Sequence, residues 1–72
     1  MPKLLIKFFG DPGEDICEPE EAKYLLDFAD RIVLVDGREV RSYEELLKIV
    51  SQKKYRDQEL VEVVQIPALA GG

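Results

Sequence analysis

Hydrophobic residues near both ends of the chain alternate with period two, which predicts strands. Residues 3–9 place Leu4, Ile6 and Phe8 on one face of a strand, and residues 60–66 are equally rich in β-branched residues. Because both runs are strongly hydrophobic, we expect them to lie side by side at the centre of one sheet.

Turn residues mark further strands between these two. Residues 10–13 (Gly-Asp-Pro-Gly) have strong turn chemistry, so residues 14–17 are expected to form a short return strand. Residues 32–35 are a second β-rich run. The Asp36-Gly37 pair that follows is a favoured two-residue hairpin turn, and residues 38–41 should return beside the run.

Two segments have the periodicity of an amphipathic helix. The first begins near Pro19, a residue suited to the first helical position, and it should run for about three turns. Its apolar stripe consists of Ala22, Leu25, Leu26 and Ala29, widened by Tyr24 and Phe28. The second begins at Ser42, which forms a capping-box pattern with Glu45, and its apolar face is smaller.

This order of elements predicts a single α+β domain. Both helices must bury an apolar stripe, and a mixed sheet of about four or five strands is the surface that can receive the first. We expect residues 1–67 to form a roll with one main helix across a twisted sheet and a second, shorter helix. Strand pairing should end at Pro67, which has no N–H, and residues 68–72 should form a flexible tail.

The composition narrows the possible functions. With one cysteine and no histidine in 72 residues, neither an intrachain disulfide nor a zinc site is expected. A net charge of −5 argues against direct binding of nucleic acid, which needs a basic surface. No apolar run approaches the roughly 20 residues of a membrane span. We therefore expect a cytoplasmic protein that makes no membrane contact and binds other proteins.

Candidate chemistry within the domain is weak. Cys17 has no neighbouring His, Lys or Arg, so a small buried hydrophobe is the simplest interpretation. The sequence has no glycine-rich phosphate loop followed by Lys and Ser or Thr, and it has no calcium-loop spacing. The acidic residues considered for calcium are Asp11, Glu14, Asp15 and Glu18. We expect no catalytic residue and no metal or other cofactor bound by this chain.

The end of the sequence carries the strongest candidate site. Residues 67–72 thin to small side chains and finish in Gly71-Gly72, and backbone without Cβ atoms can pass through a narrow slot in another protein. A terminal carboxylate, with a pKa of about 3.5, is ionised at neutral pH and is a poor acyl electrophile, so it must be activated. The alternative is a frayed end, or glycines left by cloning.

Four segments resemble the β-grasp sulfur carriers ThiS and MoaD and, more distantly, ubiquitin. Residues 3–9 are similar to the first strand of MoaD, and residues 33–40 resemble the valine-rich strand, turn and return of ThiS. Residues 59–64 resemble the last strand of both. Residues 67–72 (Pro-Ala-Leu-Ala-Gly-Gly) are similar to the proline-containing ending of MoaD, which also finishes in two glycines.

The resemblance implies a ubiquitin-like β-grasp fold and a sulfur-carrier function. A ubiquitin-activating-type adenylating enzyme would use ATP to activate Gly72. Sulfur donor and acceptor enzymes would then form and use a Gly72 thiocarboxylate, for thiamine, molybdopterin or tRNA thiolation. The residues that would thread into the partner are Pro67, Ala68, Leu69, Ala70 and Gly71. As MoaD does, the chain would also be able to act as the small subunit of a molybdopterin-synthase-like enzyme.

A docking surface is predicted beside this tail. If Val61 and Val63 point inward, the residues between and after them point outward, beside the outward residues of the first strand. An exposed apolar patch of this kind marks an interface, although the second helix would provide an alternative cover. The predicted patch consists of Leu5, Phe9, Val64 and Ile66.

Two other functions stay open at this point. A ubiquitin-like modifier would use the same activated Gly72, attacked in that case by a lysine of the modified protein. A β-grasp interaction module would carry Gly71 and Gly72 incidentally, so their deletion would leave its partners unaffected.

Overall fold

The two hydrophobic terminal strands form the centre of the sheet. The computed structural model describes residues 2–68, in which five strands form one mixed sheet in the order β2-β1-β5-β3-β4. The central strands β1 (Lys3–Phe8) and β5 (Leu60–Pro67) run parallel, which confirms the expected pair. The other pairings are antiparallel and join β1 to β2 (Glu14–Cys17), β5 to β3 (Arg31–Val35) and β3 to β4 (Arg38–Val40).

The hairpin between β3 and β4 turns at Asp36-Gly37, as predicted. Asp36 has φ 51° and Gly37 has φ 82°, the left-handed pair that a two-residue hairpin turn requires. Glycine adopts such a φ without a steric cost, and aspartate tolerates it better than most residues. The hydroxyl of the buried Tyr55 donates to the Asp36 carboxylate at 2.8 Å, which ties the turn to the segment that precedes β5.

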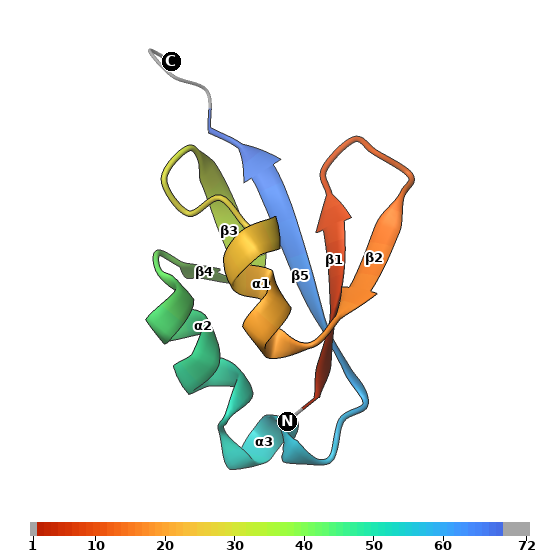
Figure 1. The fold of residues 1–72 in the computed structure, drawn as a ribbon, viewed down its shortest axis with the longest axis vertical. Coiled ribbons are helices and arrows are strands. Elements are labelled where there is room, and N and C mark those ends of the chain that lie inside the picture. Colours follow the sequence, from red (N-terminus) through yellow and green to blue (C-terminus); the bar gives the residue numbers. More distant parts are fainter. Residues whose placement is uncertain (1, 69–72) are drawn as a thin grey trace.

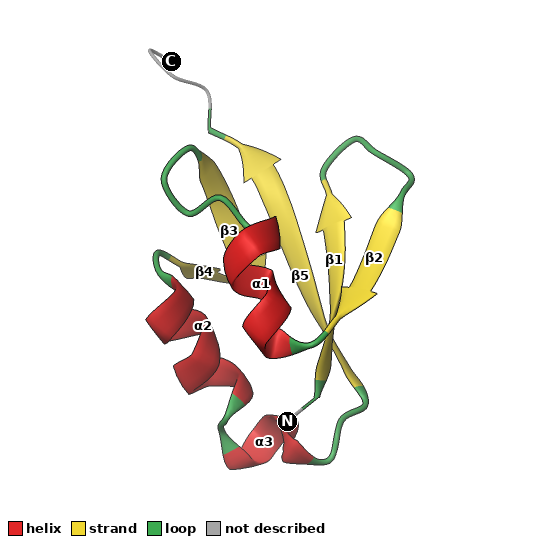
Figure 2. Ribbon diagram, in the orientation of Figure 1, coloured by secondary structure: helices red, strands yellow, loops and turns green. Residues whose placement is uncertain are grey.

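Two helices, α1 (Pro19–Leu25) and α2 (Tyr43–Val50), lie on one face of the sheet, and the short α3 (Lys53–Arg56) closes one end (Figure 1, Figure 2). The Ser42 hydroxyl accepts from the Glu45 N–H at 3.2 Å, as the capping pattern predicts. The Glu45 carboxylate, however, accepts from the N–H of Arg41 at 2.7 Å. Helix α3 was not predicted, and the expected order of helix lengths is wrong, since α2 has 8 residues and α1 has 7.

Helix α1 is shorter than the predicted three turns. Leu26 is already extended, with φ −104° and ψ 143°, although its N–H still bonds the carbonyl of Ala22. The chain turns here because the Asp27 carboxylate accepts from the N–H groups of Ala29 and Asp30, at 3.1 and 3.0 Å. Such local bonds compete with continuation of a helix.

The predicted stripe of α1 is therefore only half correct. Ala22 and Leu26 are buried, whereas Leu25 is 45% exposed and Tyr24 is 81% exposed. Ala29 is also exposed, because it lies in the turn after α1 and not on the helix. Phe28, in the same turn, still packs against the core.

The core lies between the helices and the covered face of the sheet. Inward-facing strand residues form one side of the core. Helix α2 contributes Leu46 and Val50 to the other side, and Tyr55 of α3 is also buried there. Cys17 belongs to this core, in agreement with its interpretation as a small buried hydrophobe. The strand residues of the core are Leu4, Ile6, Val33, Val35, Val40, Val61 and Val63.

Strand pairing ends at Pro67, as predicted. Pro67 lies opposite Arg31 at the end of the β3–β5 ladder. The N–H of Ala68 then donates to the carbonyl of Asp30 at 3.4 Å. Proline supplies no N–H of its own, and the bond from Ala68 lies beyond the end of β5. The expected flexible tail falls mainly on residues 69–72, which lie outside the described residues.

Candidate functional site

The chain leaves the sheet at one end of the molecule, which we call the tail end. The loop between β1 and β2 and the connection from α1 to β3 lie at this same end (Figure 1). Both Pro67 and Ala68 are exposed. The predicted activation site Gly72 and the three residues before it lie outside the described residues.

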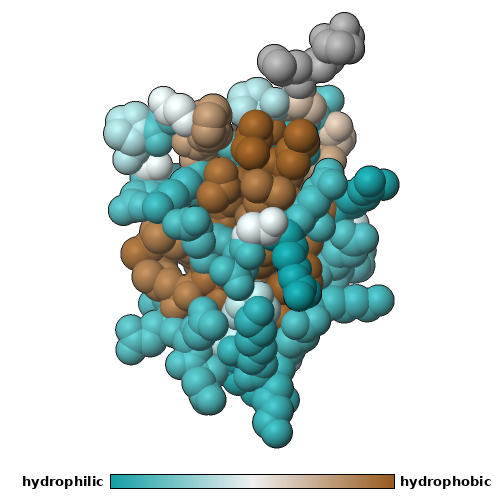
Figure 3. Space-filling model, turned by 180° about the vertical axis from the view of Figure 1, so that it is seen from behind, coloured by the Kyte–Doolittle hydropathy of each residue, from teal (hydrophilic) through white to brown (hydrophobic). Residues whose placement is uncertain are grey.

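The face of the sheet opposite the helices carries an apolar cluster close to the tail end. Ile32 lies opposite Ile66, and Leu34 lies opposite Val64, in the register of β3 and β5. Ile32 is 37% exposed and the other three are half-buried. Figure 3 shows this face, with apolar surface gathered over its upper part and hydrophilic side chains over its lower end. We call these four residues the outer patch.

The predicted docking residues are only partly brought together. Val64 and Ile66 belong to the outer patch, and Phe9, just after β1, is 71% exposed. Leu5 is half-buried on the same face, but it lies opposite Glu62. The Lys7 ammonium bonds the Glu62 carboxylate at 2.9 Å, so a charged pair separates Leu5 from the outer patch.

Sequence reasoning missed Ile32 and Leu34 as members of this surface. The run from Ile32 to Val35 has no polar residue, and it therefore gives no indication of which face is covered. The Asp36-Gly37 turn, which fixes the end of β3, and the alternation of β5 were the only sequence signals for which residues of β3 face outward. Pairing of Leu34 with Val64 follows only when the β3–β5 register is known.

Charges on this face form a row next to the outer patch. Lys7 lies 2.9 Å from Glu62 and 3.7 Å from Glu14, across three neighbouring strands. Hydrogen bonding and attraction by Glu62, with a smaller effect of Glu14, raise the pKa of the Lys7 ammonium. Exposed pairs of this type add little to stability, so their main effect is to give the face a polar boundary.

Cys17 is the one thiol of the described residues, and it is buried. Burial, helped by the nearby carboxylates of Glu21, Asp15 and Glu18, raises the pKa of this thiol and so lowers its thiolate fraction at neutral pH. Within residues 2–68 no group of His, Cys, Asp and Glu could hold a metal ion. A membrane-crossing helix would have to be longer and more apolar than any that the structure describes.

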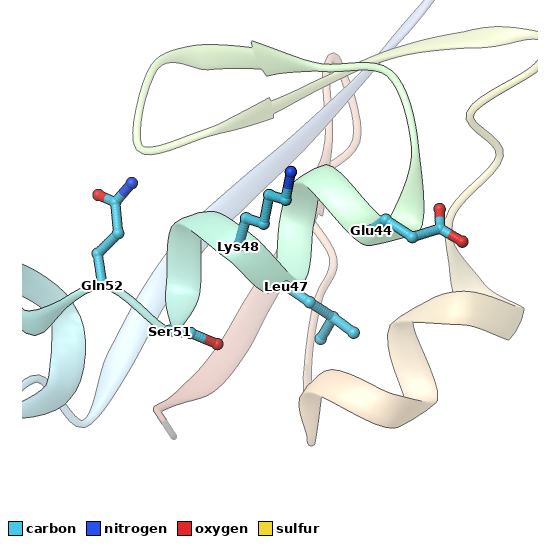
Figure 4. A pocket seen from close by; sticks show the side chains of 5 residues that line it. All are labelled: Glu44, Leu47, Lys48, Ser51 and Gln52. Carbon is cyan, nitrogen blue, oxygen red and sulfur yellow. The ribbon is translucent and has the colours of Figure 1, made fainter.

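Two hollows lie away from the tail end, and neither suggests chemistry. One, of about 540 Å³, is open and follows α2; Figure 4 shows Lys48 and Leu47 pointing away from each other there. It is lined by Glu44, Leu47, Lys48, Ser51 and Gln52. The other, of about 450 Å³, is lined by Pro2, Lys3, Ile16, Gln58, Glu59 and Leu60. Polar groups do not converge on a common point in the first, and the second is bordered by one cation and one anion.

No protein-family model, curated protein or solved structure matches this chain.

Proposed function

We propose that the protein is a β-grasp sulfur carrier that a separate adenylating enzyme activates at Gly72. The observation that supports this most directly is the position of β5. It is a central strand, held by β1 on one side and β3 on the other, and it delivers Ala68 to the surface at the tail end. A firmly anchored strand followed by small residues presents a carboxylate without disturbing the fold.

We expect the reaction to need a partner, because the sequence has no glycine-rich phosphate loop and no histidine to act as a base. The partner would bind ATP and join the Gly72 carboxylate to AMP, releasing pyrophosphate. Hydrosulfide, or a sulfur donor enzyme that supplies it, would then attack the acyl carbon. The bond to the AMP oxygen breaks, AMP leaves, and a thiocarboxylate remains for an acceptor enzyme. The outer patch would dock on the adenylating enzyme beside its active site.

A mass measurement tests this function. The intact protein is incubated with an extract of the cells it comes from, with ATP and with sulfide. Replacement of one carboxylate oxygen by sulfur raises the mass by about 16 Da. The same measurement verifies that Gly72 carries a free carboxylate in the mature protein, which the reaction requires.

Two variants make the test specific. Deletion of Gly72 should abolish the mass gain, because the new terminal carboxylate, on Gly71, ends one residue short of the position that the partner activates. Gly71→Val keeps the length and the carboxylate but adds a side chain, and it should abolish the gain if the tail enters a narrow slot.

Other outcomes would point elsewhere. Conjugates of the protein with lysines of other proteins would favour a modifier. If the protein binds its partner and gains no mass, and loss of both glycines changes neither result, it is an interaction module and the proposal is wrong.

A further inference from the structure

A single buried polar side chain, that of Gln65, lies in β5 just before the tail end. Among the described residues it is the only polar one in the core, and its exposure is 0%. The neighbouring inward residues of the same strand, Val61 and Val63, are apolar. A buried amide costs free energy unless its donors and acceptors are satisfied, so its presence here calls for an explanation.

The amide of Gln65 bonds the end of α1. Its oxygen accepts from the N–H of Asp27 at 3.0 Å, and its nitrogen donates to the carbonyl of Leu25 at 3.4 Å. These backbone groups lie where α1 has just ended and would otherwise lack helical partners. Gln65 therefore supplies both a donor and an acceptor, which an apolar residue of the same size cannot do.

Asp27 passes this constraint to the connection that leads into β3. Its carboxylate accepts from the N–H groups of Ala29 and Asp30, and its carbonyl accepts from the N–H of Arg31 at 3.2 Å. Arg31 in turn places its guanidinium over the ring of Phe8, 4.7 Å from the ring centre. The connection is thus held at several points, and Phe8 lies opposite Gln65 in the register of β1 and β5.

The same connection holds the last described residue of the chain. The carbonyl of Asp30 accepts from the N–H of Ala68 at 3.4 Å, and Pro67 before it has no N–H to contribute. The backbone carbonyl of Gln65 also accepts from the N–H of Phe9 at 2.9 Å, at the start of the neighbouring loop. Gln65 therefore bonds the start of the β1–β2 loop through its backbone and the connection through its side chain, and the connection in turn bonds Ala68.

We propose that Gln65 is a positioning residue that sets the direction in which the chain leaves the sheet. Its bond to the N–H of Asp27 holds the connection in place, and the connection holds Ala68 through Asp30. This inference deepens the proposed function and rests on it, because a fixed exit direction matters when the following residues must enter the active site of a partner. Loss of the bond would lower the fraction of encounters in which the tail is correctly aimed.

Two variants that each remove hydrogen bonds of a buried side chain distinguish a positioning role of Gln65 from a general loss of stability. Gln65→Met keeps the approximate size and removes both hydrogen bonds to the end of α1. Tyr55→Phe removes one hydrogen bond of a buried side chain, that to Asp36, at the other end of the molecule. With global unfolding measured for both, any change at Ala68 beyond that explained by lost stability is specific to Gln65.

The readout on the free protein is nuclear magnetic resonance. In Gln65→Met we expect the N–H of Asp27 to exchange with solvent about tenfold faster than in Tyr55→Phe, because it loses its acceptor. The dipolar coupling of the Ala68 N–H, scaled to that of Val63 in the same strand, should fall in Gln65→Met and stay unchanged in Tyr55→Phe. An unchanged Ala68 coupling in Gln65→Met would overturn the inference.

A second pair keeps the test decisive if Gln65→Met does not fold. Asp27→Ala removes the acceptor of the Ala29 and Asp30 N–H groups, and Asp27→Asn preserves an oxygen at that position. The Ala68 coupling should fall in the alanine variant and recover in the asparagine variant. Equal couplings in the two variants would contradict the inference.

Thiocarboxylate formation is then measured with the mass assay, in cell extract with ATP and sulfide and with the carrier protein at limiting concentration. Gln65→Met and Asp27→Ala should form thiocarboxylate about tenfold more slowly, while Tyr55→Phe and Asp27→Asn keep the wild-type rate. The two proposals fail in different ways. A wild-type protein that gains no mass removes the proposed function, whereas Gln65→Met and Asp27→Ala at the wild-type rate remove the positioning role alone.

Discussion

The two faces of the sheet are built from similar residues, yet they differ in exposure. On the covered face, Leu4 and Val63 are fully buried beneath the helices. On the outer face, the neighbouring residues Leu5 and Val64 are half-buried, and Ile32 is 37% exposed. Hydrophobicity alone does not distinguish the faces, since valine, leucine and isoleucine serve both. What distinguishes them is which side α1 and α2 cover (Figure 1).

This difference leads us to expect different effects from substitutions on the two faces. The covered face stabilises the fold, and a chain of this size has little stability to spare, about 3–5 kcal/mol. The outer patch is open and bounded by the charges of Lys7 and Glu62. We therefore expect substitutions on the covered face to affect stability, and substitutions in the outer patch to affect binding.

The largest effect is expected from adjacent alanine substitutions in β1. Leu4→Ala should lower the free energy of unfolding by about 3 kcal/mol, because it leaves a cavity in the core. Leu5→Ala should lower it by about 1 kcal/mol, because its side chain is already partly solvated. Urea denaturation of both variants measures the difference. Equal losses would mean that the two faces are equally covered.

A smaller effect on stability, and a larger one on activity, is expected in the outer patch. Ile32→Ser should change the free energy of unfolding by about 1 kcal/mol and slow thiocarboxylate formation in the cell-extract assay about tenfold. Leu60→Ser is the matched control, since Leu60 is 40% exposed at the other end of β5. Its rate should stay at the wild-type value. Equal slowing by both variants would argue against a docking role for the outer patch.

The smallest effect is expected from a substitution of Lys7, whose ion pairs lie between Leu5 and the outer patch. Lys7→Met removes the ion pairs with Glu62 and Glu14 and should lower stability slightly at neutral pH. The pKa of Lys7 is raised above its ordinary value of 10.5, so its contribution is fully present below that pH. It is lost as the pH rises through the raised pKa.

The stability gap between wild type and Lys7→Met should therefore close under strongly alkaline conditions. Urea denaturation of both proteins at neutral and at alkaline pH measures this gap. A gap that stays constant across this range would show that the ion pairs contribute nothing.

Much of the fold was predictable because the signals are local. Alternation identified β1 and β5, the Asp36-Gly37 pair identified the hairpin, and Pro19 marked the start of α1. Each of these follows from the backbone preferences of a few neighbouring residues. The α+β class and the central pair of strands followed in turn, since two amphipathic helices need one sheet to cover.

The errors arose where distant residues decide the outcome. The length of α1 depends on Asp27 and on Gln65, which lies nearly forty residues later in the chain. The exposure of Ile32 and Leu34 depends on the register of β3 against β5 and on the absence of a helix on that side of the described sheet. Neither is visible in a window of neighbouring residues.

The sequence by itself determined the elements, the class of fold and the small-residue ending that suggests a carrier. Tertiary structure decided which apolar face is covered and what holds Ala68 where the chain leaves the sheet. The physical reason is that backbone preferences act over a few bonds, whereas burial and the satisfaction of a polar group such as Gln65 depend on every segment packed around it.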